Sequence, residues 1–245
     1  MARALVITHT EAETAGTLAQ WLPAAGVDLA VCQPWAGDAL PADLTGVDAL
    51  VVMGGPQQAY DDTSAPWLAE TKLLLAQAVR EDLPVLGICL GAQLLAEATG
   101  GRVAPGPEGP EVGARLVAKR DAAVDDPVFG ELPLSPVVVQ WHWDAIVELP
   151  PGAMLLASSP RYAHQAFRVG TRAYGLQFHI ETPPEMVRGW AAADSASLED
   201  AGLDPDLVVE RAVAELDEVA AVWRPFVERF AALVRGETRT YLPMA

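Results

Sequence analysis

The sequence predicts an α/β fold with three layers, in which helices cover both faces of a mostly parallel central sheet. Short, continuously apolar segments suit strands that are buried on both faces, and several of them precede segments with the apolar spacing of helices. This alternation is typical of parallel sheets with helices on both sides. Right-handed crossovers then bring the carboxyl ends of the strands to one edge, where such folds bind ligands.

The first hundred residues carry the alternation. Strands are predicted over residues 4–8, 27–32, 48–53 and 84–88. Helices are predicted over residues 11–25, 66–81 and 90–99, and Gly100 and Gly101 end the last of them. The turn Gly54-Gly55-Pro56 follows the third strand, and Cys89 follows the fourth. Both turns are therefore expected at the ligand-binding edge of the sheet.

Beyond Gly101 the pattern changes to short strands separated by Pro, Gly and Asp, which indicates hairpins or a mixed extension of the sheet. These strands are predicted over residues 111–119, 136–141, 153–157, 163–169 and 172–178. A helix with proline in its first turn is predicted over residues 183–193. Residues 204–235 have amphipathic helical spacing, and Pro225 is expected to kink or divide that helix.

The length suits one α/β domain with a full core. We therefore expect a single domain over residues 1–245, with a C-terminal helical extension over about residues 191–245. The extension is expected to pack on the core, and docking of a partner is the alternative.

Composition argues against several classes of function. The net charge of −17 repels phosphate backbones and anionic membranes, so we expect no nucleic-acid binding and no membrane association. The acidity favours solubility, with a basic partner protein as the alternative. Two cysteines do not make a disulfide framework or a four-ligand zinc site, and the carboxylates lack metal-ligand spacing. Without a signal-peptide layout or a membrane-length apolar run, a cytoplasmic protein is expected.

Cys89 lies in the sequence Gly87-Ile88-Cys89-Leu90-Gly91, between a predicted strand and a predicted helix. This is the cysteine form of a nucleophile elbow, in which flanking glycines permit a tight, strained turn. The positive end of the helix dipole favours a thiolate, and the N–H of Leu90 can serve an oxyanion. The alternative is a small buried cysteine in a turn, as we expect for Cys32 in its plain apolar strand.

A thiolate nucleophile needs a proton carrier, and the carrier needs an orienting group. His179 ends a predicted strand, and Glu181 follows two residues later. In extended chain such residues share a face, so Glu181 can accept the second ring N–H of His179. A surface pair at a strand end is the alternative interpretation.

The other histidines are weaker candidates. His142 lies between two tryptophans and is followed closely by Asp144, which suits the rim of a substrate pocket or a packed aromatic cluster. His9 ends the first strand without a partner in sequence, and His164 lacks a supporting motif.

Taken together, these motifs resemble the class I (triad) glutamine amidotransferase domain, especially the glutaminase domain of GMP synthase and its stand-alone relatives, which include γ-glutamyl peptidases. The matching segments follow the family's order, cover about residues 1–190 and have the sequences VVMGGP (51–56), PVLGICLGAQ (84–93), GG (100–101), WHWD (141–144) and GLQFHIE (175–181). The resemblance implies a flavodoxin-like fold.

The resemblance also implies a role for each matching residue. Cys89 would be the nucleophile, His179 the general base and acid, and Glu181 the group that orients His179. The backbone N–H groups of Gly55 and Leu90 would form the oxyanion hole.

Gln93 would help to hold the α-amino and carboxylate end of the substrate, and His142 is a second candidate for substrate binding. The chain departs from the family at Ala92, where many relatives carry Met, and at Ile180, where Pro is usual. Neither change removes a reacting group, so the chemistry is expected to survive.

The expected reaction is hydrolysis of the γ-amide of glutamine through a γ-glutamyl thioester, which releases ammonia for a separate acceptor or synthase. A separate synthase subunit is expected because the chain has no P-loop and no room for a synthase domain. The alternative is a stand-alone γ-glutamyl peptidase or hydrolase that acts on γ-glutamyl metabolites. A catalytically silent regulatory subunit is a third interpretation, against which the intact Cys, His and Glu argue. No metal or organic cofactor is expected.

Overall fold

The centre of the molecule is an eight-stranded sheet with the order β2-β1-β3-β4-β12-β11-β10-β7 in a computed structural model that describes residues 1–237. Five neighbouring strands are parallel: β2 (Val27–Cys32), β1 (Ala2–Ile7), β3 (Ala49–Val52), β4 (Val85–Ile88) and β12 (Ala173–Leu176). Three antiparallel strands extend the sheet: β11 (Ala166–Val169), β10 (Met154–Ser158) and β7 (Ala118–Lys119). The predicted mostly parallel sheet is confirmed.

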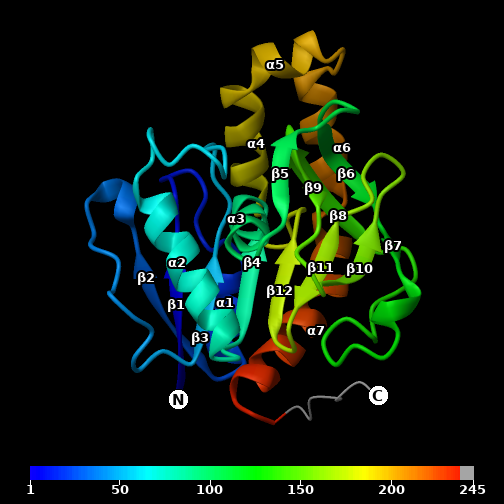
Figure 1. Cartoon of the computed structure of the whole chain (residues 1–245). Coiled ribbons are helices and arrows are strands. Elements are labelled where there is room, and N and C mark those ends of the chain that lie inside the picture. The colour runs from blue at the N-terminus through cyan, green and yellow to red at the C-terminus, as the bar shows by residue number, and fades with distance from the viewer. Residues whose placement is uncertain (238–245) are drawn as a thin grey trace.

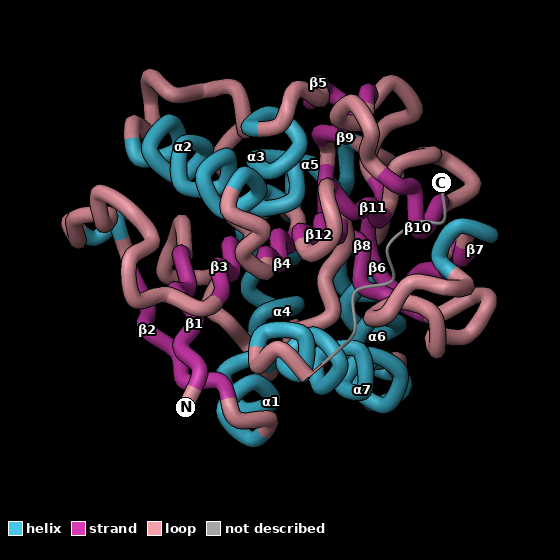
Figure 2. Tube along the Cα trace, turned by 60° about the horizontal axis from the view of Figure 1, so that its bottom comes forward, coloured by secondary structure: helices cyan, strands magenta, loops and turns pink. Residues whose placement is uncertain are grey.

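Helices form a layer on each side of this sheet, as Figure 2 shows. The first layer contains α2 (Trp67–Arg80) and α3 (Leu90–Ala98), and the second contains α1 (Leu18–Ala24) and α7 (Leu216–Val234). Successive side chains of β1 enter different cores: Val6 packs in the cluster of α1 and α7, and Ile7 packs in the cluster of α2 and α3. This explains why the parallel strands are apolar at every position.

Two short antiparallel ribbons flank the main sheet. One pairs β5 (Arg102–Pro105) with β9 (Asp144–Glu148), and the other pairs β6 (Glu111–Leu116) with β8 (Val137–His142). The remaining elements are α4 (Pro184–Ala193), α5 (Ser195–Asp200), α6 (Pro205–Ala214) and the 3-10 turns η1 (Pro34–Ala36) and η2 (Asp121–Ala123). In Figure 1, α4 and α5 lie at the top, beyond the carboxyl ends of the parallel strands.

The predicted helix over residues 11–25 begins only at Leu18, so its first half is wrong. Gly16 has a φ of +48°, and its backbone packs against the carbonyl oxygen of Glu181. The N–H of Thr17 donates to that same oxygen at 2.9 Å. These contacts to a distant part of the chain stabilise a loop between β1 and α1, so the helix begins later in the sequence than predicted.

Pro225 was expected to kink or divide the last helix, and it does not divide it. The chain divides at Glu215, between α6 and α7, and Pro225 lies inside α7. Trp223, Phe226 and Phe230 are fully buried around the proline. Packing of these aromatic side chains outweighs the hydrogen bond lost at the proline, which costs about 3 kcal/mol.

The long C-terminal helix packs on the core, as expected. The apolar side of α7 forms part of the core, in which Trp223 is fully buried, so this helix packs on the sheet rather than projecting from it. Residues 238–245 of the predicted extension lie outside the described residues. The strands β5 and β9 and the helix α5 were not predicted, and the expected strand over residues 111–119 is divided into β6 and β7.

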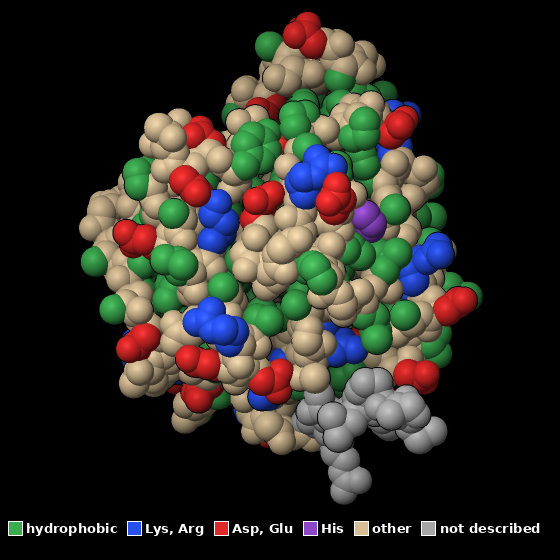
Figure 3. Space-filling model, viewed as in Figure 1, with side chains coloured by type: hydrophobic (Ala, Val, Ile, Leu, Met, Phe, Trp, Pro, Cys, Tyr) green, Lys and Arg blue, Asp and Glu red, His purple; other side chains and the backbone are tan. Residues whose placement is uncertain are grey.

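The surface carries interspersed charges on the face shown in Figure 3, so neither sign forms a continuous patch there. Of the helices within residues 1–237, none combines the length and apolarity that crossing a membrane requires.

Candidate active site

Four neighbouring parallel strands end at the candidate residues. β1 leads to His9, β3 to Gly54, β4 to Cys89 and β12 to His179, and these strands are adjacent in the order β1-β3-β4-β12. Because parallel strands run in one direction, their carboxyl ends meet at one edge of the sheet. Segments that are far apart in sequence are therefore gathered at this edge.

Cys89 forms the turn between β4 and α3 with a strained backbone. Its φ and ψ are +48° and −107°, a backbone conformation that residues other than glycine rarely adopt. A Cβ on Gly87 would lie 2.6 Å from the carbonyl oxygen of Gly91, and a Cβ on Gly91 would collide with the carbonyl oxygen of Val52. Both glycines are needed for steric reasons. The turn places the thiol at the N-terminus of α3 with only 7% of the residue exposed.

His179 and Glu181 form a buried pair, and each is 1% exposed. Nδ1 of His179 lies 2.8 Å from Oε1 of Glu181, and the other carboxylate oxygen accepts the N–H of Ile180 at 2.8 Å. A carboxylate can only accept, so Nδ1 carries the proton and Nε2 is left for chemistry. Val139 of β8 holds the backbone of His179 through two hydrogen bonds of 2.8 and 3.1 Å.

The thiol of Cys89 and the ring of His179 influence each other directly. Burial alone lowers the pKa of His179, but the charges of Glu181 and of a Cys89 thiolate, with hydrogen bonds to both, raise that pKa well above its usual value. The arrangement therefore favours an imidazolium between two anions. Trp190 of α4 packs against the ring of His179 with centroids 4.5 Å apart and the ring planes tilted by 53°, which restricts the orientation of the imidazole.

The turn after β3 brings Gly55 next to Leu90. A Cβ on Gly55 would lie 3.0 Å from Cδ2 of Leu90 and 2.7 Å from Cβ of His9. Within residues 1–237, neither the N–H of Gly55 nor that of Leu90 donates to an acceptor. Burial lowers the pKa of His9 to about 4, so its ring stays neutral behind Gly55 and accepts the indole N–H of Trp67 at 3.2 Å.

Gln93 is 4% exposed and takes part in a chain of amides that leads to the thiol. Its Nε2 lies 3.3 Å from both the carbonyl oxygen of Asp144 and Oε1 of Gln177. Nε2 of Gln177 in turn lies 3.9 Å from Sγ of Cys89. Sequence reasoning did not single out Gln177. Its place two residues before His179 was the available signal, because the two share a face of extended chain.

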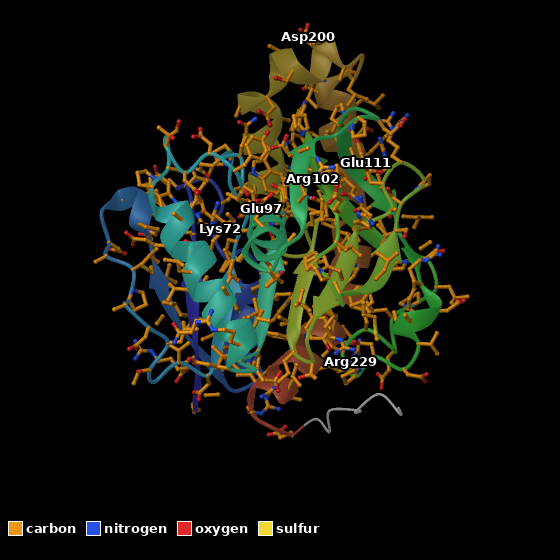
Figure 4. The ribbon with its side chains drawn as sticks, in the orientation of Figure 1. Lys72, Glu97, Arg102, Glu111, Asp200 and Arg229 are labelled. Atoms are coloured by element: carbon orange, nitrogen blue, oxygen red, sulfur yellow. The ribbon has the colours of Figure 1, made fainter. Side chains whose placement is uncertain are left out.

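His142 lies in a buried polar cluster rather than at an open rim. Its Nδ1 is 2.8 Å from the carbonyl oxygen of Asp144, and its Nε2 is 3.3 Å from Oε2 of Glu111. Figure 4 labels Glu111, which belongs to β6. The carboxylate of Glu111 also accepts from Gln165 at 2.6 Å and from Ser159 at 2.7 Å. Both ring nitrogens of His142 thus lie close to protein groups, Nδ1 in a hydrogen bond and Nε2 at a carboxylate without one.

The other features lie away from Cys89. Cys32 is buried in β2 with its Sγ 3.7 Å from the carbonyl oxygen of Ala39. A hollow of about 1090 Å³ between β6 and α6 is lined by neither Cys89 nor His179. Among residues 1–237, no three His, Cys, Asp or Glu side chains are grouped in a way that could hold a metal ion.

Two further acidic residues lie close to the site, Glu13 near His179 and Asp194 near Glu13, and sequence reasoning missed both. Asp194, at the end of α4, accepts the indole N–H of Trp141 at 2.8 Å. Glu13 comes from the loop between β1 and α1, which was expected to be helical. No local pattern could have placed either residue at the site, because each depends on tertiary packing.

Comparison with known proteins identifies the family. The model of the glutamine amidotransferase class-I family matches residues 14–188. The chain belongs to the class-I glutamine amidotransferases. The resemblance inferred from the motifs is therefore confirmed.

Relatives in this family differ in length. A glutamine amidotransferase-like protein of Salmonella typhimurium, YfeJ, is 32% identical over 80% of this chain and 82% of its own length. A GMP synthase (glutamine-hydrolyzing) of Porphyromonas gingivalis is 33% identical over 61% of this chain but only 28% of its own length. The γ-glutamyl peptidase 4 of Arabidopsis thaliana is 31% identical over 57% of this chain and 55% of its own length.

Solved structures of class-I amidotransferases share the whole architecture. A glutamine amidotransferase of Thermotoga maritima superposes with a TM-score of 0.83 at 32% identity, over 94% of this chain and 98% of the other. A glutamine amidotransferase of Methylobacillus flagellatus superposes with a TM-score of 0.82 at 27% identity, over 100% of this chain and 98% of the other. Membership of this enzyme family supports hydrolysis of the amide of glutamine in general.

Proposed function

We propose that this chain hydrolyses the γ-amide of glutamine through a γ-glutamyl thioester on Cys89 and releases ammonia for a separate acceptor or synthase. The observation that carries the proposal is the buried pair of His179 and Glu181, whose free ring nitrogen serves a cysteine at the N-terminus of α3. A strained, glycine-flanked cysteine is a costly feature for a purely structural role. Its position at a helix N-terminus favours the thiolate form.

The first half of the reaction forms the thioester. The thiolate of Cys89 attacks the γ-carbonyl carbon, and the carbonyl oxygen becomes an oxyanion. The free N–H groups of Gly55 and Leu90 are the proposed donors to that oxyanion, each contributing about 3 kcal/mol to lowering the barrier. The imidazolium of His179 then gives its Nε2 proton to the amide nitrogen, the C–N bond breaks and ammonia leaves.

The second half regenerates the enzyme. Water replaces ammonia beside His179, which is now neutral and takes a proton as water attacks the thioester carbon. The C–S bond breaks, glutamate leaves, and the thiolate and imidazolium are restored. Glu181 holds the ring in the tautomer that both halves need and stabilises its positive charge.

The substrate's α-amino and carboxylate end requires other groups. Gln93 remains the proposed residue for this end, through the amide chain that links it to Gln177 and Cys89. Nδ1 of His142 is held by the carbonyl oxygen of Asp144 and Nε2 faces Glu111, so its proposed contribution is to support the strand β8 that borders the thiol.

The alternative function is hydrolysis of γ-glutamyl peptides or amides by the chain alone. Matches to γ-glutamyl peptidases favour it, and the chemistry differs only in the leaving amine. We further propose that the chain forms one domain with its C-terminal helices, acts in the cytoplasm and needs no cofactor. A separate synthase subunit is proposed only for the glutaminase function.

The test is steady-state release of ammonia and glutamate by the purified chain, combined with mass spectrometry after treatment with the glutamine analogue 6-diazo-5-oxo-L-norleucine. We expect one adduct, on Cys89. Cys89→Ser is expected to lose both the adduct and turnover, whereas Cys32→Ser, the matched control, keeps both. If Cys32→Ser were the inactive variant, the nucleophile would be wrongly assigned. Absence of both adduct and turnover in the natural chain would favour the silent-subunit interpretation.

A further inference from the structure

The carboxylate of Glu13 lies beside Gly54 and near His179, although the proposed reaction gives it no role. A Cβ built on Gly54 would collide with Oε2 of Glu13 and would lie 3.0 Å from Cε1 of His179. The carboxylate and the imidazole thus flank the same glycine at the end of β3. Cε1 lies between the two ring nitrogens, Nδ1, which faces Glu181, and Nε2, which is left for Cys89 and the scissile amide.

The loop that carries Glu13 is fixed to the catalytic strand end. The N–H of Thr17 donates to the carbonyl oxygen of Glu181 at 2.9 Å, and Gly16 packs against that carbonyl. Gly16 adopts a φ of +48° to make this approach, and a Cβ there would collide with Glu181. The position of Glu13 is therefore set by contacts to the residue that orients His179.

Glu13 differs from the neighbouring carboxylates because no partner for it lies among the described residues. Glu181 binds His179 and Ile180, and Asp194 binds Trp141. Within residues 1–237, the side chain of Glu13 accepts no hydrogen bond and forms no ion pair.

The surroundings of Glu13 make its ionised form costly in the free enzyme. Burial raises its pKa to about 7, the charge of His179 opposes that rise, and the charges of Glu181 and Asp194 add to it. A cation placed beside the carboxylate would relieve this cost, and an anion would increase it.

The scissile amide defines which part of a substrate meets this carboxylate. The acyl carbon must lie between Sγ of Cys89 and the N–H groups of Gly55 and Leu90, and the leaving nitrogen must face Nε2 of His179. The carboxylate of Glu13 and Cε1 of that ring lie on the same side of Gly54, directly before the proposed oxyanion donor Gly55, which puts the carboxylate within reach of the leaving amine. A leaving amine with its own carboxylate, as in a γ-glutamyl peptide, would bring two anions together, whereas a diamine would offer a cation.

We propose that Glu13 is a specificity-determining residue that favours γ-glutamyl amides with a cationic leaving amine, accepts neutral ones and rejects those whose leaving amine carries a carboxylate. This inference rests on the proposed function, of which it selects a substrate class. It predicts that among γ-glutamyl compounds the amides of diamines are better substrates than γ-glutamyl peptides.

The test compares three γ-glutamyl amides of similar size: the 2-aminoethylamide, the propylamide and the carboxymethylamide. We expect kcat/KM of the natural chain at pH 8 to be at least about tenfold higher for the 2-aminoethylamide than for the carboxymethylamide, as expected for one nearby charge. Glu13→Gln should bring the ratio to within about threefold. Glu11→Gln, an exposed change of the same type in the same loop, should leave it unchanged.

The pH dependence separates specificity from a structural role. Because the carboxylate ionises as pH rises through about 7, the preference for the cationic amide should increase from pH 6 to pH 8 in the natural chain. It should stay flat in Glu13→Gln. Titration of Cys89 and His179 affects all three amides alike and cancels in the ratio. Glu13→Asp, which keeps the charge, should retain the preference in part and covers the case in which Glu13→Gln does not fold.

Three outcomes would overturn the inference. A ratio near one in the natural chain contradicts it, and so does a ratio that survives Glu13→Gln. If Glu13→Gln lowered kcat/KM equally for all three amides, Glu13 would instead act at the α-ammonium of the glutamyl group or at His179. If the natural chain hydrolysed neither glutamine nor any amide, and the diazo analogue did not label Cys89, the proposed function itself would fail and this inference with it.

Discussion

Nδ1 of His179 lies 2.8 Å from Oε1 of Glu181, and the pair is almost completely shielded from water. Glu181→Gln keeps the shape but removes the charge that raises the pKa of His179. We expect kcat/KM for glutamine to fall by about 10²–10⁴-fold, as when a neutral amide replaces an orienting carboxylate. In the pH profile of the rate of Cys89 labelling, the alkaline limb should move to lower pH. Glu185→Gln, an exposed change on α4, is the control, and equal effects of the two variants would contradict the role of Glu181.

The same pair links stability to pH. The pKa of folded His179 is raised above 6.5, so protonation of this residue stabilises the fold fully below about pH 6.5. That contribution is lost as pH rises through the folded pKa. The difference in free energy of unfolding between the natural chain and His179→Gln should therefore be largest near pH 6 and shrink toward pH 9. Urea unfolding at several pH values measures it, and a difference that grew with pH would disprove the ion pair.

Sequence alone located the residues whose position follows from the order of strands. Cys89 and His179 each follow a recognisable apolar segment, and right-handed crossovers bring the ends of such strands together. Residues placed by long-range contacts could not be found in this way. Glu13 enters the site because Gly16 and Thr17 contact Glu181, which local helical spacing does not encode.

The orientation of polar side chains could not be predicted from the sequence either. His142 faces Glu111 because β6 pairs with β8, and the order of strands alone does not reveal that pairing. Similarly, α7 continues through Pro225 because the buried aromatic residues on either side outweigh the local preference of proline.

Replacing glycine by alanine should have opposite effects on stability at two helical positions, because α3 approaches β3 closely at Gly91 whereas Gly189 lies in open space. Gly91→Ala should destabilise the fold by about 2–4 kcal/mol and slow labelling of Cys89, because its Cβ would collide with the carbonyl oxygen of Val52. Gly189→Ala in α4 meets no atom within 4 Å and should stabilise by up to about 1 kcal/mol. Thermal unfolding and the labelling rate check both. Equal tolerance at the two positions would contradict the packing described for the Cys89 turn.

The cluster around Glu111 predicts that His142 matters more for folding than for substrate affinity. His142→Asn should lower the free energy of unfolding by about 2–4 kcal/mol, because it leaves the buried carboxylate of Glu111 with one partner fewer. KM for glutamine should change by less than about threefold, since Nδ1 is held by the carbonyl oxygen of Asp144 and Nε2 faces the buried carboxylate of Glu111. His164→Asn provides a comparison at a histidine outside the cluster. A large rise in KM with unchanged stability would instead place His142 in the substrate pocket.

The raised pKa of Glu13 predicts that removing its charge stabilises the folded protein. Its pKa is about 7 in the folded protein against 4.5 for the ordinary group, and burial is the main cause. Below pH 4.5 both the folded and the unfolded chain hold the proton, so the residue costs nothing. As pH rises from 4.5 to 7 the unfolded chain ionises first, and the folded state loses stability relative to the unfolded one.

The variant Glu13→Gln removes this loss, so at pH 8 it should be more stable than the natural chain by about 1–3 kcal/mol. The gain should vanish toward pH 4.5, whereas exposed Glu11→Gln should show no such trend. Urea unfolding between pH 5 and pH 8 measures the effect, and a Glu13→Gln variant that was less stable at pH 8 would show that the carboxylate has a partner that stabilises its charge.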